Sequence, residues 1–170
     1  MWGSSDFGGW YQASHPRVVA ALTVAAGSAE VAEDATAEAF VRAYERWDRV
    51  RRMASPDGWL YRVALNLLRR RQRRLAVERD LLRRAVPVPT APAALAPEVW
   101  DAVRVLTQRQ RTAIALRYVL DLPEAEVAQM MGIARGTASA TLATARRHLG
   151  HLLVDELDPD EPELEEVCDG

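Results

Sequence analysis

The stretch from Trp59 to Arg74 predicts one helix with an apolar face and a basic face. Residues spaced by three and four share one side of a helix, and the apolar ones here are Leu60, Val63, Ala64 and Leu67. The same spacing places a polar set on the opposite side: Arg62, Asn66, Arg69, Arg70 and Arg73. No acidic residue lies between Trp59 and Arg74, so the stripe suits a run of phosphates, whose counterions are released on contact. An ordinary solvated helix face is the alternative.

Two helices are predicted before this stretch. The first covers much of residues 7–26, opens at the turn signal Gly8-Gly9, and has Pro16 near its start and Gly27 just past its end. The second covers residues 28–47, with Ser28 as a candidate cap. Its inward face is expected to hold Val31, Ala35, Ala39 or Phe40, and Ala43, while Glu33, Asp34, Glu38 and Arg42 lie outside. The pattern alone favours a solvated outer face.

A basic loop is predicted over residues 48–58, because Ser55-Pro56-Asp57-Gly58 is a turn signal. It carries Arg49, Arg51 and Arg52 and is flanked by Trp47 and Trp59. Basic groups beside aromatic rings suit a single strand with unstacked bases. The alternative is that both tryptophans belong to the core, and we expect each to be at least partly buried.

The four prolines within residues 86–97 exclude a helix there and favour an extended linker. We therefore expect one unit over residues 1–85 and a second over residues 98–153.

The second unit has the pattern of a helix-turn-helix. Thr107 and Gln110 have capping-box spacing for a helix to about Val119, Pro123 starts the next helix, and Gly132 ends it. A longer helix then follows from about Arg135 to Leu153. The expected interior comprises Val127, Ala128, Met131, Ile133, Leu142, Ala145 and Leu149. The candidate DNA contacts are Arg135, Thr137, Ser139, Thr141 and Arg146. Helical hairpins without DNA function share this pattern.

The net charge of −2 conceals an uneven distribution. Residues 1–85 hold fifteen Arg and ten acids (+5), residues 86–153 seven Arg and five acids (+2), and residues 154–170 nine acids and no Arg (−9). We expect the acidic segment 154–170 to be disordered. It either aids solubility or shields the basic faces and weakens DNA binding.

The remaining composition disfavours several classes of protein. No run of eighteen apolar residues predicts a membrane span, and the first residues lack a secretory pattern. One cysteine, Cys168, forms no internal disulfide, which favours a reducing, cytoplasmic setting. His15, His148 and His151 make no plausible metal or nucleophile site with it, so we expect neither an enzyme nor a cofactor.

The chain resembles the extracytoplasmic-function (ECF) group of bacterial RNA polymerase sigma factors in three segments that follow one another in the family's order. The segments are AEDATAEAFVRAYERW (32–47), SPDGWLYRVALNLLRRRQRR (55–74) and residues 106–149. The resemblance implies an all-α fold with a region 2-like bundle, a proline-rich linker and a region 4-like helix-turn-helix. It implies core RNA polymerase and promoter DNA as partners, with an anti-sigma protein as a further candidate. It also implies that the outer face of residues 28–47 docks on the polymerase and is not simply solvated. The docking residues would be Asp34, Glu38, Phe40 and Arg42.

The resemblance also assigns the two DNA-reading surfaces. The helix-turn-helix residues given above would read the minus-thirty-five element. The minus-ten element would be held by Arg49, Arg51, Arg52, Trp59, Arg62, Asn66, Arg69, Arg70 and Arg73.

The sequence departs from the family pattern at several positions. Ala37 stands where Gln is common, and Ala134 stands where a capping Ser is common. The run Gly136 to Leu142 has Ser139 and Thr141 in place of two basic residues, so we expect weak minus-thirty-five affinity. The alternative function is a stand-alone helix-turn-helix regulator. A regulator of that kind usually dimerises to match a two-fold operator, and the sequence has no heptad repeat for dimerisation, which counts against this alternative.

Overall fold

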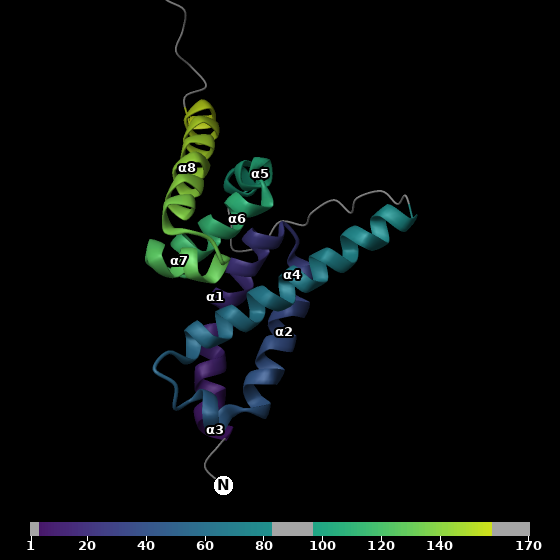
Figure 1. Ribbon diagram of the computed structural model, residues 1–170, viewed down its shortest axis with the longest axis vertical. Helices are drawn as coiled ribbons and strands as arrows, with labels where there is room; N and C mark the ends of the chain where they lie inside the picture. The colour runs from purple at the N-terminus through teal and green to yellow at the C-terminus, as the bar shows by residue number, and fades with distance from the viewer. Residues whose placement is uncertain (1–3, 83–96, 158–170) are drawn as a thin grey trace, which may run out of the picture.

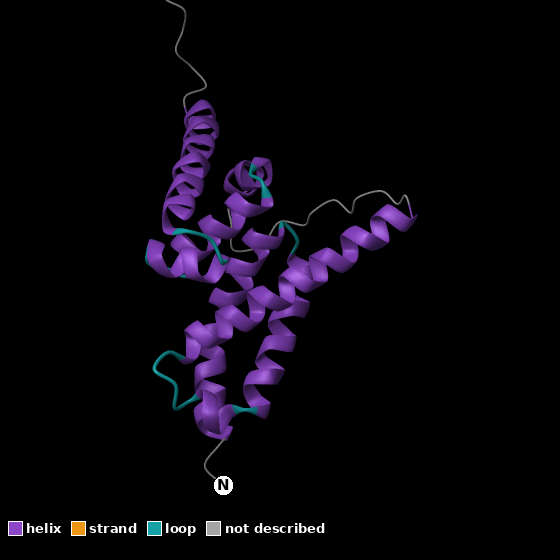
Figure 2. Ribbon diagram, viewed as in Figure 1, coloured by secondary structure: helices purple, strands orange, loops and turns teal. Residues whose placement is uncertain are grey.

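The computed structural model describes residues 4–82 and 97–157, and all regular elements in these ranges are helical (Figures 1 and 2). They are α1 (Ser4–Ala26), α2 (Ala29–Glu45), α3 (Trp47–Val50), α4 (Pro56–Leu82), α5 (Pro97–Val105), α6 (Gln108–Ile114), the π-helical turn η1 (Ala115–Val119), α7 (Glu124–Met131) and α8 (Arg135–Leu157). The all-α prediction is confirmed. The acidic residues 158–170 and the linker before Pro97 lie outside the described residues.

Helix α1 starts earlier than the sequence suggested. Gly8 and Gly9 lie inside it and Pro16 lies in its middle, so the predicted opening turn is wrong. The reason is tertiary, because the first turns of α1 carry aromatic rings that pack against α2 and α3. The ring centroids of Trp10 and Trp47 are 4.9 Å apart, and those of Tyr11 and Phe40 are 4.7 Å apart. These contacts favour helix over the local turn signal.

The predicted loop 48–58 is also shorter than expected. The first part of this stretch belongs to α3, in which Trp47 and Val50 are buried, and α4 begins at Pro56. The start of α4 is capped, since the Ser55 hydroxyl accepts a hydrogen bond from the Gly58 N–H at 3.0 Å. Asp57 ties this end to α1, where its carboxylate accepts bonds from the Trp10 indole at 2.6 Å and the Ser14 hydroxyl at 2.9 Å.

The predicted caps of the other helices are largely present. The Ser28 hydroxyl accepts from the Val31 N–H at 3.4 Å at the start of α2. Thr107 and Gln110 form the full capping box of α6, and Gly132 ends α7 in the left-handed conformation. Pro123 precedes α7 as its N-cap rather than standing inside its first turn.

Helix α5 was not predicted, and the helix expected to run to Val119 finishes as the π-helical turn η1. In that turn the Leu120 N–H donates to the Ala115 carbonyl at 3.1 Å. Helix α8 reaches Leu157, beyond the expected Leu153, so the expectation of disorder is wrong for residues 154–157. The α7–α8 pair forms the predicted helix-turn-helix, with Val127, Ala128, Leu142 and Ala145 buried and Met131 and Leu149 partly buried against the core.

Helix α1 joins the helices before and after the linker into one hydrophobic core. On one side it packs against α2 and α4, and on the other against α6 and η1. The junction is lined by apolar side chains from all these elements, including Leu22, Leu65, Leu116 and Leu120. At its edge the Arg17 guanidinium donates to the Leu120 carbonyl at 3.3 Å. The helix-turn-helix is therefore connected to α1 through α6 and η1, and α7 contacts α4 through a hydrogen bond between Arg69 and Met130 (Figure 1).

Gly27 lies in a position that only glycine fills without strain. Its φ is +71°, and a Cβ there would lie 3.4 Å from the Arg111 guanidinium carbon. We expect Gly27→Ala to lower the free energy of unfolding by about 1–2 kcal/mol, measured by urea denaturation. Gly136→Ala is the matched control, since its Cβ would meet nothing within 4 Å. Equal stability of the two variants would contradict this account.

Candidate nucleic-acid interface

The two faces of α4 lie as the spacing indicates. Leu60, Ala64 and Leu67 are buried and Val63 is partly buried against the core. On the opposite side Arg62, Asn66, Arg70 and Arg73 are exposed. The three guanidinium groups and the Asn66 amide are open to an incoming nucleic acid, and no acidic residue lies between Trp59 and Glu78.

Arg69 differs from its neighbours because it is partly buried between α4 and α7. Its guanidinium donates to the Met130 carbonyl at 3.2 Å. Burial lowers the pKa of Arg69, and the nearby charge of Arg73 lowers this pKa further. Arginine nevertheless remains protonated near neutral pH. Arg69 therefore lends its charge to a contact between helices in this arrangement.

The tryptophan at the start of α4 also faces α7. Trp59 is half-buried and lines a cavity of about 240 Å³ between the start of α4 and α7. The cavity is lined by Ser55, Gly58, Trp59, Arg62, Glu126, Gln129 and Met130. Two residues expected to hold the minus-ten element, Trp59 and Arg62, thus lie opposite the first helix of the helix-turn-helix.

The segment before the cavity beside Trp59 is basic. The loop before it carries the other minus-ten candidates, and Arg49, Arg51 and Arg52 are all exposed. Arg51 forms an ion pair with Asp48 at 3.1 Å, whereas Arg49 and Arg52 form none among the described residues. Arg49 and Arg52 therefore keep exposed guanidinium groups in the segment that precedes Trp59.

The recognition helix α8 presents fewer free polar groups than its sequence suggests. Arg135, Thr137 and Arg146 are exposed, while Ser139 and Thr141 are half-buried. The Thr141 hydroxyl donates to the Thr137 carbonyl at 2.7 Å, within its own helix. The Arg146 guanidinium donates to the Tyr118 hydroxyl at 3.4 Å. Arg135 and Thr137, at the start of α8, are the side chains most available to a base edge.

The expected docking residues of α2 divide into two groups. Asp34 and Glu38 are exposed and Arg42 is partly exposed, and Glu38 pairs with Arg42 at 2.6 Å. Phe40 is only 4% exposed. Its ring packs against Trp10, Tyr11 and His15. A side chain in this position stabilises the bundle and is not part of the outer surface of α2, so placing Phe40 on that surface is wrong.

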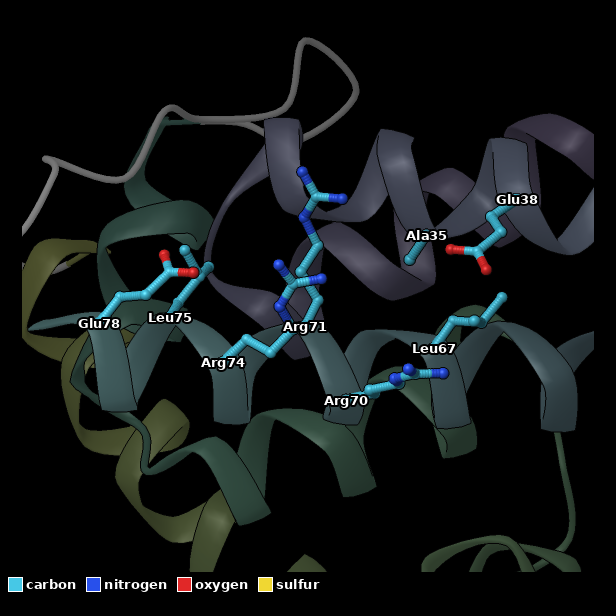
Figure 3. A pocket seen from close by; sticks show the side chains of 8 residues that line it. All are labelled: Ala35, Glu38, Leu67, Arg70, Arg71, Arg74, Leu75 and Glu78. Carbon is cyan, nitrogen blue, oxygen red and sulfur yellow. The ribbon is translucent and has the colours of Figure 1, made fainter.

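Sequence reasoning missed a cleft between α2 and α4 (Figure 3). It has a volume of about 360 Å³ and is lined by Ala35, Glu38, Leu67, Arg70, Arg71, Arg74, Leu75 and Glu78. Arg71 reaches across it to form an ion pair with Asp34. The signal in the sequence was the density of arginines from Arg69 to Arg74, which leaves some of them on the flank between the two faces.

Comparison with known proteins places both halves of this arrangement in one family. The family model for sigma-70 region 2 matches residues 10–77, and the model for sigma-70 region 4 matches residues 97–149. The RNA polymerase sigma-E factor of Streptomyces avermitilis is 30% identical over 122 residues, which cover 69% of this chain and 68% of that protein. The ECF RNA polymerase sigma factor SigM of Mycobacterium tuberculosis is 30% identical over 139 residues, covering 74% and 66%.

The fold has a solved counterpart. The sigma factor RpoE of Bartonella quintana, crystallised with the anti-sigma factor NepR, aligns with a TM-score of 0.75 and 22% identity, covering 88% of this chain and 97% of that one. The helical bundle, the helix-turn-helix and these matches define a sigma factor of the sigma-70 type. The chain belongs to the ECF group of RNA polymerase sigma factors. No helix within residues 4–82 and 97–157 is long and apolar enough to cross a membrane.

The start of α8 offers a test of the missing cap. The Ala138 N–H donates to the Ala134 carbonyl at 3.0 Å, so Ala134 occupies the capping position without a side-chain acceptor. We expect Ala134→Ser to raise the free energy of unfolding by about 1 kcal/mol, seen as a higher melting temperature. Ala140→Ser, at an exposed position inside α8, is the control and should give no gain. If Ala134→Ser gave no gain either, the helix start would be capped in another way.

Proposed function

We propose that this sigma factor binds core RNA polymerase through the outer face of α2 and directs it to promoters through α4 and the helix-turn-helix. The observation that carries the proposal is the exposed stripe Arg62, Asn66, Arg70 and Arg73 on a helix whose opposite face is buried. The factor acts in the cytoplasm and supplies promoter preference, while the chemistry of RNA synthesis belongs to the polymerase. Asp34 and Glu38 are the exposed acidic groups of the docking face.

The chemistry of α4 suits a melted minus-ten element. Guanidinium contacts to phosphate supply affinity without sequence information. Base selection then comes from groups such as the Asn66 amide, which can form two hydrogen bonds with one base, and from stacking on the Trp59 ring. Arg49 and Arg52, which are exposed before α4, extend the basic surface along the same strand.

The helix-turn-helix supports weaker recognition of the minus-thirty-five element. Two positions that are basic in the family pattern are Ser139 and Thr141, and the Thr141 hydroxyl already bonds its own helix. Arg135 and Thr137 remain as base-edge contacts, with Arg146 further along the helix. Promoter choice therefore depends mainly on the minus-ten element.

The two DNA-binding surfaces cannot contact their promoter elements at the same time in the arrangement that the structure shows. Two elements about 25 base pairs apart are separated by about 85 Å at 3.4 Å per pair, whereas α8, with 23 residues, is about 35 Å long. Helix α7 also lies opposite Trp59 and Arg62 and binds Arg69. The helix-turn-helix, together with α6 and η1, must therefore separate from α1 and α4 when the factor engages a promoter.

The proposal is tested by run-off transcription with core RNA polymerase from Streptomyces on a genomic promoter library. We expect discrete new start sites that share a sharp minus-ten element and a poorly defined minus-thirty-five element. Arg62→Ala should reduce transcript yield by about tenfold, because a contact to DNA is worth about 1–3 kcal/mol, while pulldown of core polymerase is unchanged. Arg46→Ala, at an exposed arginine outside α4, is the control. DNA binding without core binding would favour a stand-alone regulator instead.

Domain separation is tested by the distance between two nitroxide labels, one at Val77→Cys on α4 and one at His148→Cys on α8, with Cys168→Ser as background. Both labelled positions are exposed. Pulsed electron spin resonance should show a short distance in the free protein and a longer one with core polymerase and promoter DNA. An unchanged distance in an active complex would contradict the separation.

A further inference from the structure

The cleft between α2 and α4 combines an apolar floor with basic walls (Figure 3). Ala35, Leu67 and Leu75 supply the apolar surface, and Arg70, Arg71 and Arg74 supply the guanidinium groups. A surface of this kind fits a peptide that carries both carboxylates and aliphatic side chains, because leucine side chains are buried while arginines pair with acids.

Two of these arginines are available to a partner. Arg71 is paired with Asp34, and the rim residue Glu38 is paired with Arg42. Arg70 and Arg74 form no ion pair with any residue that the structure describes. Glu78 is the remaining acid in the lining, so the cleft keeps a positive excess that its own side chains do not satisfy.

We propose that the acidic segment that follows α8, residues 158–170, docks in this cleft. The segment holds seven acidic residues and no basic one, and Leu164 and Val167 are interspersed among the acids. Its composition matches the cleft in both charge and apolar content. No other stretch of similar length in the chain has so many acids without an arginine.

The segment is long enough for an intramolecular contact. Helix α8 ends at Leu157, and the thirteen residues that follow span up to about 45 Å when extended. This exceeds the length of α4, which is about 40 Å for 27 residues. Helix α7 packs against α8 and contacts α4, but Leu157 is at the opposite end of α8, which points away from α4 in Figure 1. The segment must therefore run back along α8, which is about 35 Å long for 23 residues, and its extended span of about 45 Å exceeds that length.

The other hollows along α4 are less suitable for an acidic peptide. The cavity at Trp59 and Arg62 contains Glu126, whose charge repels carboxylates. The hollow of about 510 Å³ that contains Arg69 and Arg109 has one of these two guanidinium groups already bound to the Met130 carbonyl. The cleft beside Arg70 and Arg74 is therefore the site favoured by charge.

Docking there has a consequence for activity that rests on the proposed function. Glu38 lines the cleft, and Asp34 is joined to it through Arg71. A segment in the cleft would cover part of the face proposed to bind core polymerase. The acidic segment would then restrain the factor by competing with the polymerase, and its contact with Arg70 would also cover one member of the DNA-binding stripe.

The only cysteine of the chain, Cys168, lies within the acidic segment and allows a direct test on the full-length protein. A nitroxide attached to it broadens NMR signals of nearby backbone amides. We expect signal loss for residues 67–75 and for Ala35, and none for the start of α8 at residues 135–141. The loss should disappear at high salt, because exposed ion pairs are screened.

Paired charge reversals make the test specific. Arg70→Glu with Arg74→Glu should abolish the broadening at the cleft. Arg46→Glu with Arg147→Glu changes the net charge equally at exposed arginines outside the cleft and should leave it intact. Melting temperatures of both variants confirm folding, and Arg70→Gln with Arg74→Gln provides a milder pair.

Several results would overturn the proposal. These are broadening centred on residues 49–52 or on the hollow at Arg69 and Arg109, broadening that survives Arg70→Glu with Arg74→Glu, or no broadening at all. Broadening seen only when labelled protein is mixed with unlabelled ¹⁵N protein would show contact between copies instead.

The link to the polymerase is tested separately by deleting residues 158–170, which removes no residue that the structure describes. Tighter binding of core polymerase by the shortened chain would support competition. If the nitroxide showed docking but the deletion left polymerase affinity unchanged, the cleft contact would stand and the proposed docking face on α2 would be wrong.

Discussion

The burial of α1 on two sides is the constraint on which the rest of the structure depends. One side of this helix packs against α2 and α4, and the other receives α6 and η1. Ala21 and Ala25 are almost completely buried, and their small side chains allow neighbouring helices to approach closely. Because α1 holds α4 directly and the helix-turn-helix through α6 and η1, it also determines which basic groups face solvent and which face protein.

The arginines of α4 consequently occupy different environments although they follow one another in sequence. Arg62 and Arg73 are exposed, Arg69 is bound to the Met130 carbonyl, and Arg71 is paired with Asp34. A helix is narrow enough for residues two or three apart to face three different neighbours. The family assignment identifies the helix as part of region 2, but the tertiary contacts decide what each guanidinium can do.

Features encoded over a few residues were predictable from the sequence. The buried set Leu60, Ala64 and Leu67, the capping box at Thr107 and the left-handed Gly132 all follow from local spacing or backbone preference. The errors arose where distant residues decide the outcome. Pro16 lies inside α1. Phe40 was a candidate for the inward face, and its assignment to the docking face fails because rings from α1 surround it. The burial of Arg69 and the cleft at Arg71 likewise require knowledge of which helices become neighbours, and no periodicity within one segment contains that information.

The continuous core has a consequence for engineering promoter specificity. Exchanging residues 97–157 for the corresponding part of another sigma factor would place foreign side chains against Leu22 and Leu65, where Leu116 and Leu120 now pack. Such a chimera would carry a mismatched contact in its free form even if each half were intact. The two halves of this factor therefore cannot be exchanged independently of each other. A working chimera would also need the face of α1 that matches the new residues.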